Sequence, residues 1–243
     1  MPGKYRTIHD AVKSADVVEL ELMVKAGASI NEVDKVPQNN RFTPLHWAAY
    51  CGSLECMHWL LWHGADTTDV TRHGWTPVHI AAIRGQDACI QALGNNGADM
   101  NALDLKGNTA AHLACTHGNT YTLQSILRFG ADLAEVDRNG WSPLHTASYH
   151  GRLGCVQILF KWGAVMDTTD NDGNTPCHLA AMEGHLEVLK YVINNSEVPL
   201  DAIQSRNDRG ERPKDCAVQF YKKQCIEYLE EIAAAFVKES QRI

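Results

Sequence analysis

Apolar residues recur at helical spacing in short segments along this chain, and glycine and polar residues separate the segments. In the stretch 153–161, Leu159 and Phe160 follow Val156 by three and four residues, so we expect one helix face to bury all three. A similar stripe near the C-terminus consists of Cys225, Leu229, Ile232 and Phe236. Because a helix of fewer than about 12 residues is marginal in water by itself, such helices must cover their apolar faces with neighbours.

Turn and capping residues predict where these helices begin and end. The sequence DRNG at 137–140 predicts a tight turn in which its glycine takes a positive φ. Ser142 is a suitable N-cap, and Pro143 suits the first helical position, where its missing N–H is no loss. We therefore expect a helix that runs to about Tyr149 and ends at Gly151, followed by a second helix.

This turn and pair of helices repeat along the chain. The tetrapeptides TPLH, TPVH, TAAH, SPLH and TPCH follow one another at intervals of 33 residues, beginning at Thr43, Thr76, Thr109, Ser142 and Thr175. A period of 33 with a T-P-L-H-x-A core is typical of the ankyrin repeat, a β-turn followed by two short antiparallel helices. The chain resembles the ankyrin-repeat family. The resemblance implies an all-α ankyrin-repeat solenoid of about seven helix-turn-helix units with β-turn or hairpin connections.

The array extends over the whole sequence. Weaker copies of the motif at Thr7 and Arg212 predict a single domain, residues 1–243, with an N-terminal cap over 1–36, internal repeats over 37–206 and a C-terminal cap over 207–243. Two intervals exceed 33 residues, which places extra residues at 36–40 and 197–200. We expect both insertions to be loops, because added length costs little at a turn. They are either recognition elements or neutral drift.

Composition and charge restrict the class of protein. With 22 basic and 29 acidic residues the net charge is -7, which disfavours a protein that neutralises nucleic-acid phosphates or coats anionic lipid. No apolar run reaches the roughly 18 residues that span a bilayer, and the segment MPGKYRTIHD lacks the apolar core of a signal peptide. Cys56, Cys89 and Cys155 share one repeat position, as expected of reduced core thiols. We therefore expect a protein of the cytoplasm or nucleus.

Histidine is abundant, yet its placement favours a structural role over catalysis. Six histidines share one repeat position, in which the imidazole can bond to turn backbone or to the neighbouring hydroxyl: His9, His46, His79, His112, His145 and His178. A second group, at Cys51, Cys56, His58 and His63, lies on different helix faces and does not converge as zinc ligands do. No GxSxG, GxxxxGK[ST], GxGxxG or HExxH motif occurs. We predict no enzyme activity, no cofactor and no metal.

The family resemblance implies that a protein partner binds on the concave face, which the hairpin tips and first helices form. The exposed positions of that face hold Phe42, Tyr50, Arg72, His73, Trp75, Ile83, Arg84, Lys106, His117, Arg138, Trp141, Tyr149 and His150. Aromatic residues and arginine dominate interface hot spots. We expect a monomeric scaffold or adaptor whose partner is an acidic segment with apolar anchors. For Trp75 and Trp141, bracing of their own hairpins is an equal alternative.

Two further interpretations depend on particular residues. Arg72, Arg84, Lys106 and Arg138 raise the alternative of a nucleic-acid-associated binding module, but four basic residues on a chain of net charge -7 release few counterions. Asn101 lies in the phrase GADMNALD, and the family resemblance implies hydroxylation of an asparagine there.

Overall fold

The computed structural model describes residues 4–240, and their side chains as far as Phe236. Residues 1–3 and 241–243, which belong to the predicted caps, lie outside the described residues. The described residues group into two compact units. Of the described residues, unit 1 comprises 4–114 and 121–132, and unit 2 comprises 115–120 and 133–240. The single domain with its two caps stays a prediction.

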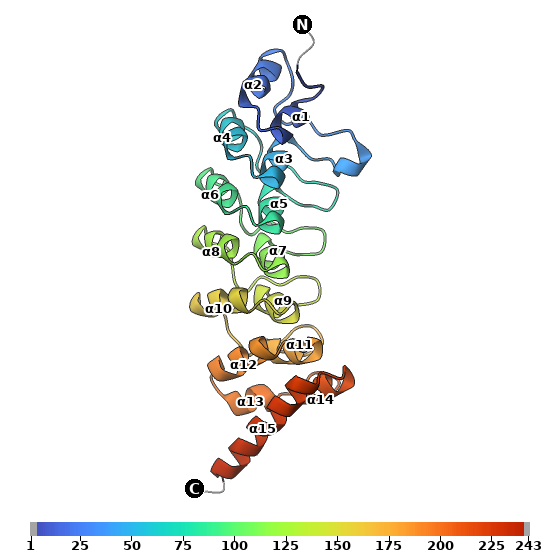
Figure 1. The fold of residues 1–243 in the computed structure, drawn as a ribbon, viewed down its shortest axis with the longest axis vertical. Coiled ribbons are helices and arrows are strands. Elements are labelled where there is room, and N and C mark those ends of the chain that lie inside the picture. Colours follow the sequence, from blue (N-terminus) through green and yellow to red (C-terminus); the bar gives the residue numbers. More distant parts are fainter. Residues whose placement is uncertain (1–3, 241–243) are drawn as a thin grey trace. The chain divides into compact units, whose positions relative to one another are not determined.

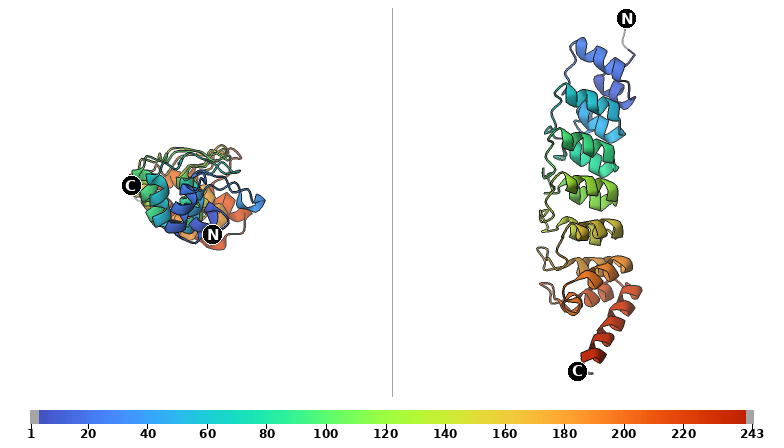
Figure 2. Two further views of the ribbon diagram at one scale, coloured as in Figure 1. Left: turned by 90° about the horizontal axis from the view of Figure 1, so that it is seen from above. Right: turned by 90° about the vertical axis from the view of Figure 1, so that its left-hand side faces the viewer.

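Unit 1 consists of helix pairs stacked in two rows (Figure 1). The helices are α1 (Ile8–Lys13), α2 (Val17–Lys25), α3 (Pro44–Cys51), α4 (Leu54–Trp62), α5 (Pro77–Arg84) and α6 (Asp87–Asn95). Helices α1, α3 and α5 contact one another in a first row, and α2, α4 and α6 form the second row. The hairpin loops of this unit all leave the same side of the helix pairs (Figure 2, right). Helices α7 (Ala110–His117) and α8 (Thr120–Arg128) contribute residues to both units.

Unit 2 repeats this arrangement with α9 (Pro143–Tyr149), α10 (Leu153–Lys161), α11 (Pro176–Glu183), α12 (Leu186–Asn195), α14 (Pro213–Gln219) and α15 (Lys223–Ser240). Helix α11 packs between α9 and α14 in the first row, and α12 contacts α10 and α15 in the second. Within residues 4–240 there is no strand, which agrees with the all-α prediction. No helix of the described residues has the length and apolar character needed to cross a membrane.

Local sequence signals set the helix ends as expected. The Ser142 hydroxyl accepts a hydrogen bond from the backbone N–H of His145, and Pro143 occupies the first turn of α9. Helix α10 spans the predicted residues, with Val156 and Leu159 buried. The burial of Phe160 was predicted wrongly, since 36% of its surface is exposed. Its ring meets the edge of Tyr191 at 6.0 Å, which places it over the neighbouring second-row helix and outside the core.

The insertions correct a second expectation, because neither is a simple loop. Residues Pro37–Asn39 form one turn of 3-10 helix, η1, and Pro199–Gln204 form an additional helix, α13. Proline at the first helical position favours α13, and its Ala202 and Ile203 are buried. Helix α13 contacts α12, α14 and α15, so it belongs to the packed core of unit 2.

Candidate functional site

The repeated histidines are buried and serve as structural hydrogen-bonding groups, as the sequence indicates. In unit 1, Nδ1 of His46 accepts from the backbone N–H of Thr43 at 3.2 Å, so the ring carries its proton on Nε2. That Nε2–H donates to the carbonyl oxygen of Trp75 at 2.9 Å. In unit 2, His145 forms the same bonds with Ser142 and with the carbonyl of Thr168, at 3.2 and 3.0 Å. Each imidazole thus joins a helix start to the following hairpin.

Burial keeps four of these histidines, His46, His79, His145 and His178, uncharged at neutral pH. It lowers the pKa of His46 to about 4. The pKa values of His79, His145 and His178 are also lowered, and burial is the largest cause for each. Because both ring nitrogens of His145 are engaged and the ring is 1% exposed, it is poorly placed to exchange protons with a substrate.

The group Cys51, Cys56, His58 and His63 does not converge on one point, as the sequence predicts. Cys51 is exposed at the end of α3, while Cys56 is buried in α4. His58, two residues after Cys56, is exposed. Among the described residues, no group of three or more His, Cys, Asp or Glu side chains is arranged to hold a metal ion.

The two tryptophans of the predicted surface brace hairpins. The indole N–H of Trp75 donates to a carboxylate oxygen of Asp104 at 3.1 Å, in the next hairpin of unit 1. In unit 2 the indole N–H of Trp141 donates to Asp170 at 2.9 Å. In unit 1 a backbone hydrogen bond also joins the two hairpins, since the N–H of Leu105 donates to the carbonyl of His73 at 3.1 Å. Each indole N–H thus joins its own hairpin to the next one. Both rings remain half-exposed, and partner binding stays a prediction.

A close approach of hairpins also explains one turn glycine. Gly74 has a φ of +77°, and a Cβ atom there would lie 2.9 Å from the backbone nitrogen of Leu105. A side chain at this position would therefore strain the backbone and separate the two hairpins. The tips themselves present Arg72, His73 and Lys106, all of which are exposed as predicted.

Phe42 corrects the predicted surface, because its side chain is 7% exposed. Its ring packs 5.0 Å from Trp47 and 6.1 Å from Tyr50, centroid to centroid. Phe42, the residue before Thr43, therefore points its ring into an aromatic cluster beneath the surface. Tyr50, at the outer end of this cluster, is 39% exposed.

Unit 1 gathers aromatic rings and cations where its first-row helices end. The guanidinium of Arg84 lies 4.5 Å from the ring centroid of Tyr50, and the ammonium of Lys13 lies 4.0 Å from that of Trp47. Ile83 is half-buried beside Arg84. We call Tyr50, Arg84 and Ile83 the unit 1 aromatic–basic patch.

Unit 2 places a different set of groups at its first-row helix ends. Tyr149 packs against Trp141 and His150, with ring centroids 4.8 and 5.2 Å apart. His117 is exposed and His150 is half-buried, while Arg138 is exposed at a hairpin tip. The predicted residues of this unit are therefore accessible at least in part.

Sequence reasoning missed two basic residues of unit 2. Nε of Arg152 donates to the carbonyl of Thr116 at 3.1 Å, and Nε2 of His185 donates to the carbonyl of Tyr149 at 2.9 Å. Each follows the glycine that ends a first-row helix, and they lie 33 residues apart. Their equivalent positions in the 33-residue repeat were the sequence signal that could have identified them.

A third missed feature lies at the end of α14. Val218, Phe220 and Tyr221 are exposed by 49%, 45% and 90% of their surface. Tyr221 has a φ of +57° and occupies the repeat position at which glycine stands in Gly151 and Gly184. A tyrosine in the left-handed region is unusual, because its Cβ crowds the backbone.

Asn101 joins successive loops of unit 1. Its Nδ2 donates to the carbonyl of Gly130 at 3.2 Å, and its Oδ1 accepts from the backbone N–H of Asp132 at 2.8 Å. Hydroxylation of Asn101 stays a prediction.

Comparison with known proteins agrees with the repeat and the helix pairs. A model of ankyrin repeats in three copies matches residues 8–104, 89–170 and 162–238. Similar solved structures include the ankyrin repeat domain of Bcl-3, a unique member of the IkappaB protein family, with 26% identity, a TM-score of 0.77, and 93% of this chain and 99% of that chain covered. The human ASB11 ankyrin repeat domain is similar at 26% identity and a TM-score of 0.79, with coverages of 93% and 98%.

Proposed function

Because the chain belongs to the ankyrin-repeat family, whose domains generally mediate protein–protein interaction, we propose that it is a non-catalytic scaffold or adaptor that binds another protein. The proposed binding surface is the concave face, where the hairpin tips and the ends of the first-row helices lie. A monomer with this surface free is the form expected to bind, in the cytoplasm or nucleus.

One observation supports this proposal most directly, the stacking of Arg84 on the exposed ring of Tyr50. Tyrosine and arginine bury large areas, and both keep polar atoms that can bond to a partner. Stacking on the ring holds the guanidinium in place, so less side-chain freedom is lost when a partner binds. Such a pair suits a partner segment with a carboxylate beside an apolar side chain.

The charged residues around the patch favour an acidic partner. Arg72 and Lys106 extend the positive groups along the hairpin tips of unit 1, and Arg138 does so in unit 2. Nucleic acid is the alternative ligand, but the net charge of -7 disfavours it. Surface charges of this kind mainly accelerate association, and their effect weakens with salt.

The test replaces the patch and leaves the fold intact. Tyr50→Ala with Arg84→Ser is compared with the parent by affinity capture from a native extract and, for each captured protein, by titration. We expect the double variant to lose partner affinity by about 2 kcal/mol or more if these are hot spots. The circular dichroism spectrum should stay that of the parent.

A matched control lies on the second-row helices of the same unit. Trp62 is 86% exposed on α4 and His58 is also exposed, so Trp62→Ala with His58→Ser removes comparable groups away from the proposed face. This control should retain its partners. Equal capture by the parent and the Tyr50/Arg84 variant would contradict the patch as the binding site.

A further inference from the structure

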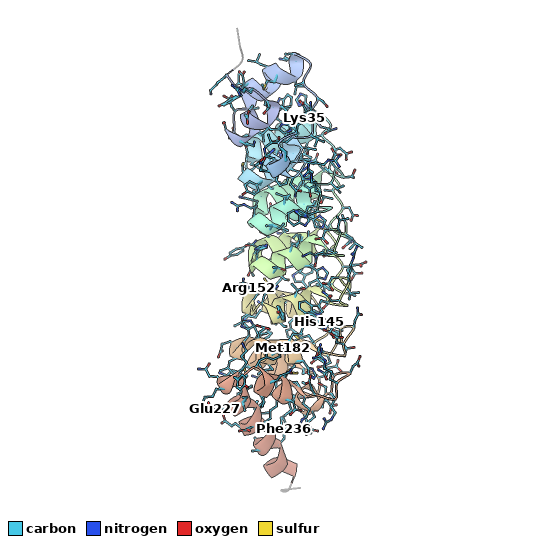
Figure 3. The ribbon with its side chains drawn as sticks, turned by 90° about the vertical axis from the view of Figure 1, so that its right-hand side faces the viewer. Lys35, His145, Arg152, Met182, Glu227 and Phe236 are labelled. Atoms are coloured by element: carbon cyan, nitrogen blue, oxygen red, sulfur yellow. The ribbon has the colours of Figure 1, made fainter. Side chains whose placement is uncertain are left out.

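Four basic side chains lie where the first-row helices of unit 2 end: His117, His150, Arg152 and His185. We call them the unit 2 basic cluster. Arg152 reaches across to the preceding repeat, since Nε bonds to the carbonyl of Thr116. Its Cδ would lie 3.1 Å from a Cβ on Gly118, so the Arg152 side chain lies against the residues directly before and after His117 in sequence. Figure 3 shows Arg152 at the opposite edge of its repeat from the buried His145.

His185 occupies the equivalent place one repeat later. Its ring bonds to the carbonyl of Tyr149 and covers Gly151, where a Cβ would be 2.5 Å from Nδ1. It therefore flanks His150 as Arg152 flanks His117. The glycines at these helix ends create the room for both basic side chains to lie against the backbone.

The groups that act electrostatically on His150 are mostly basic side chains. Arg152, His117 and His185 are three of them, and Glu183 is the one carboxylate. Burial raises the pKa of the Tyr149 hydroxyl, and the nearby Glu183 carboxylate raises it further. Burial and then Arg152 lower the pKa of His150 and of His117 below the ordinary value for histidine. Both imidazoles are thus neutral at neutral pH.

We infer that His117, His150 and Arg152 form a binding site for carboxylate groups of an acidic protein segment, and that mild acidification strengthens binding there. The inference deepens the proposed function and rests on it, since it names the chemistry and the pH regulation of the unit 2 part of that surface. Arg152 supplies a permanent charge. The two histidines add charge when a ligand anion favours their protonation.

The direction of the pH effect follows from proton linkage. An anion close to His117 and His150 stabilises their charged forms, so the complex holds more protons than the free protein at mildly acidic pH. Affinity must then rise as the pH falls below about 6.5, because the pKa values of both histidines in the free protein are lowered from that ordinary value. Aspartate and glutamate side chains, with pKa values of about 4, remain ionised through most of that range.

The test uses the full chain and a fluorescein-labelled peptide of glutamates as the probe, titrated at about pH 5.5 and about pH 7.5 at low salt. We expect the parent to bind at least about fivefold more tightly at the lower pH. His117→Gln with His150→Gln should abolish this ratio and keep the weaker binding. Arg152→Gln should weaken binding at both pH values.

Two exposed histidines of unit 1, both on or next to helix α4, give the matched control. His58→Gln with His63→Gln removes two histidines from other helices, and the pH ratio should stay that of the parent. A parental ratio in the His117/His150 variant would overturn the inference. The proposed function is tested separately, by partner capture with the Tyr50/Arg84 variant. Failure of that test can therefore be distinguished from failure of the pH-dependent site.

A second measurement needs no substitution. In histidine Cε1–H nuclear magnetic resonance titrations of the parent, the peptide should raise the pKa of His117 and His150 and leave the His58 signal unmoved. Titration curves of His117 and His150 that coincide with and without the peptide would also overturn the inference.

Discussion

At the scale of single residues, Tyr221 shows what the repeat demands of its helix-ending position. Its φ of +57° lies in the left-handed region, which costs a residue with a Cβ about 1–2 kcal/mol. The side chain is 90% exposed, so packing recovers little of this cost. Tyr221→Gly should therefore raise the free energy of unfolding by about 0.5–1 kcal/mol, after the greater freedom of glycine in the unfolded chain is subtracted. Urea denaturation measures the change.

The neighbouring residue supplies the control for this prediction. Phe220 has a φ of -102°, which a residue with a Cβ adopts without strain. Phe220→Gly should consequently lower stability, because glycine only adds freedom to the unfolded chain there. If both glycine variants were destabilised equally, strain at Tyr221 would be the wrong explanation.

The burial of a residue was predicted well where the repeat alone determines it, and less well where side chains of neighbouring residues determine it. The buried histidines could be assigned because their bonds run to backbone groups that each repeat supplies. Phe42 and Trp75 share one repeat position, yet Phe42 is buried whereas the ring of Trp75 is half-exposed. Phe42 has Trp47 and Tyr50 to pack against. A single repeat read alone cannot show such differences between neighbours.

At the scale of elements, His145 determines how firmly α9 is attached to the hairpin after it. Its ring bonds both to the N-cap Ser142 and to the carbonyl of Thr168, and the site is buried. His145→Ala should lower the free energy of unfolding by about 1–3 kcal/mol, because buried partners are left unsatisfied. Since stacked repeats depend on their neighbours, the loss should be felt at more than one interface. Chemical denaturation monitored by circular dichroism checks this.

The exposed His58 provides the control variant for His145→Ala. His58→Ala removes the same atoms from a helix surface, where the effect on stability should stay within about 0.5 kcal/mol. A His145 variant as stable as the His58 variant would mean that the two bonds of His145 contribute nothing net.

Helix α13 shows where prediction of elements from the sequence ends. Periodicity and caps predicted the paired helices because each helix carries its own apolar stripe and its own stop signals. Helix α13 lies outside the 33-residue repeat, so the insertion at 197–200 was predicted to be a loop. Its helical form depends on Ala202 and Ile203 packing against helices that lie before and after it in sequence.

At the scale of the whole molecule, the same buried histidine recurs in both units and makes the fold sensitive to acid. Burial lowers the pKa of His46 to about 4, and the pKa values of His79, His145 and His178 are lowered too. In the unfolded chain each would titrate near 6.5. Below that pH the unfolded chain therefore binds more protons than the folded chain, so acid favours unfolding.

We predict that the free energy of unfolding is constant between about pH 7 and 8 and falls steadily from about pH 6.5 towards 4. His46 alone should account for about 3 kcal/mol across that window, because each pKa unit corresponds to roughly 1.4 kcal/mol. Carboxylates with a lowered pKa, such as Asp34 and Asp104, act in the same direction. Their effect lies mainly below about pH 4, so the histidine window can be measured apart from it.

The histidine origin of this acid sensitivity is tested with His46→Gln, by urea midpoints at several pH values between about 4.5 and 7.5. The variant lacks the imidazole that the unfolded parent protonates, so it should be less stable than the parent at neutral pH. The difference in the free energy of unfolding should shrink as the pH falls, because only the parent loses the stability that depends on a neutral His46. A gap between parent and variant that stays constant with pH would show that His46 is not a source of the acid sensitivity.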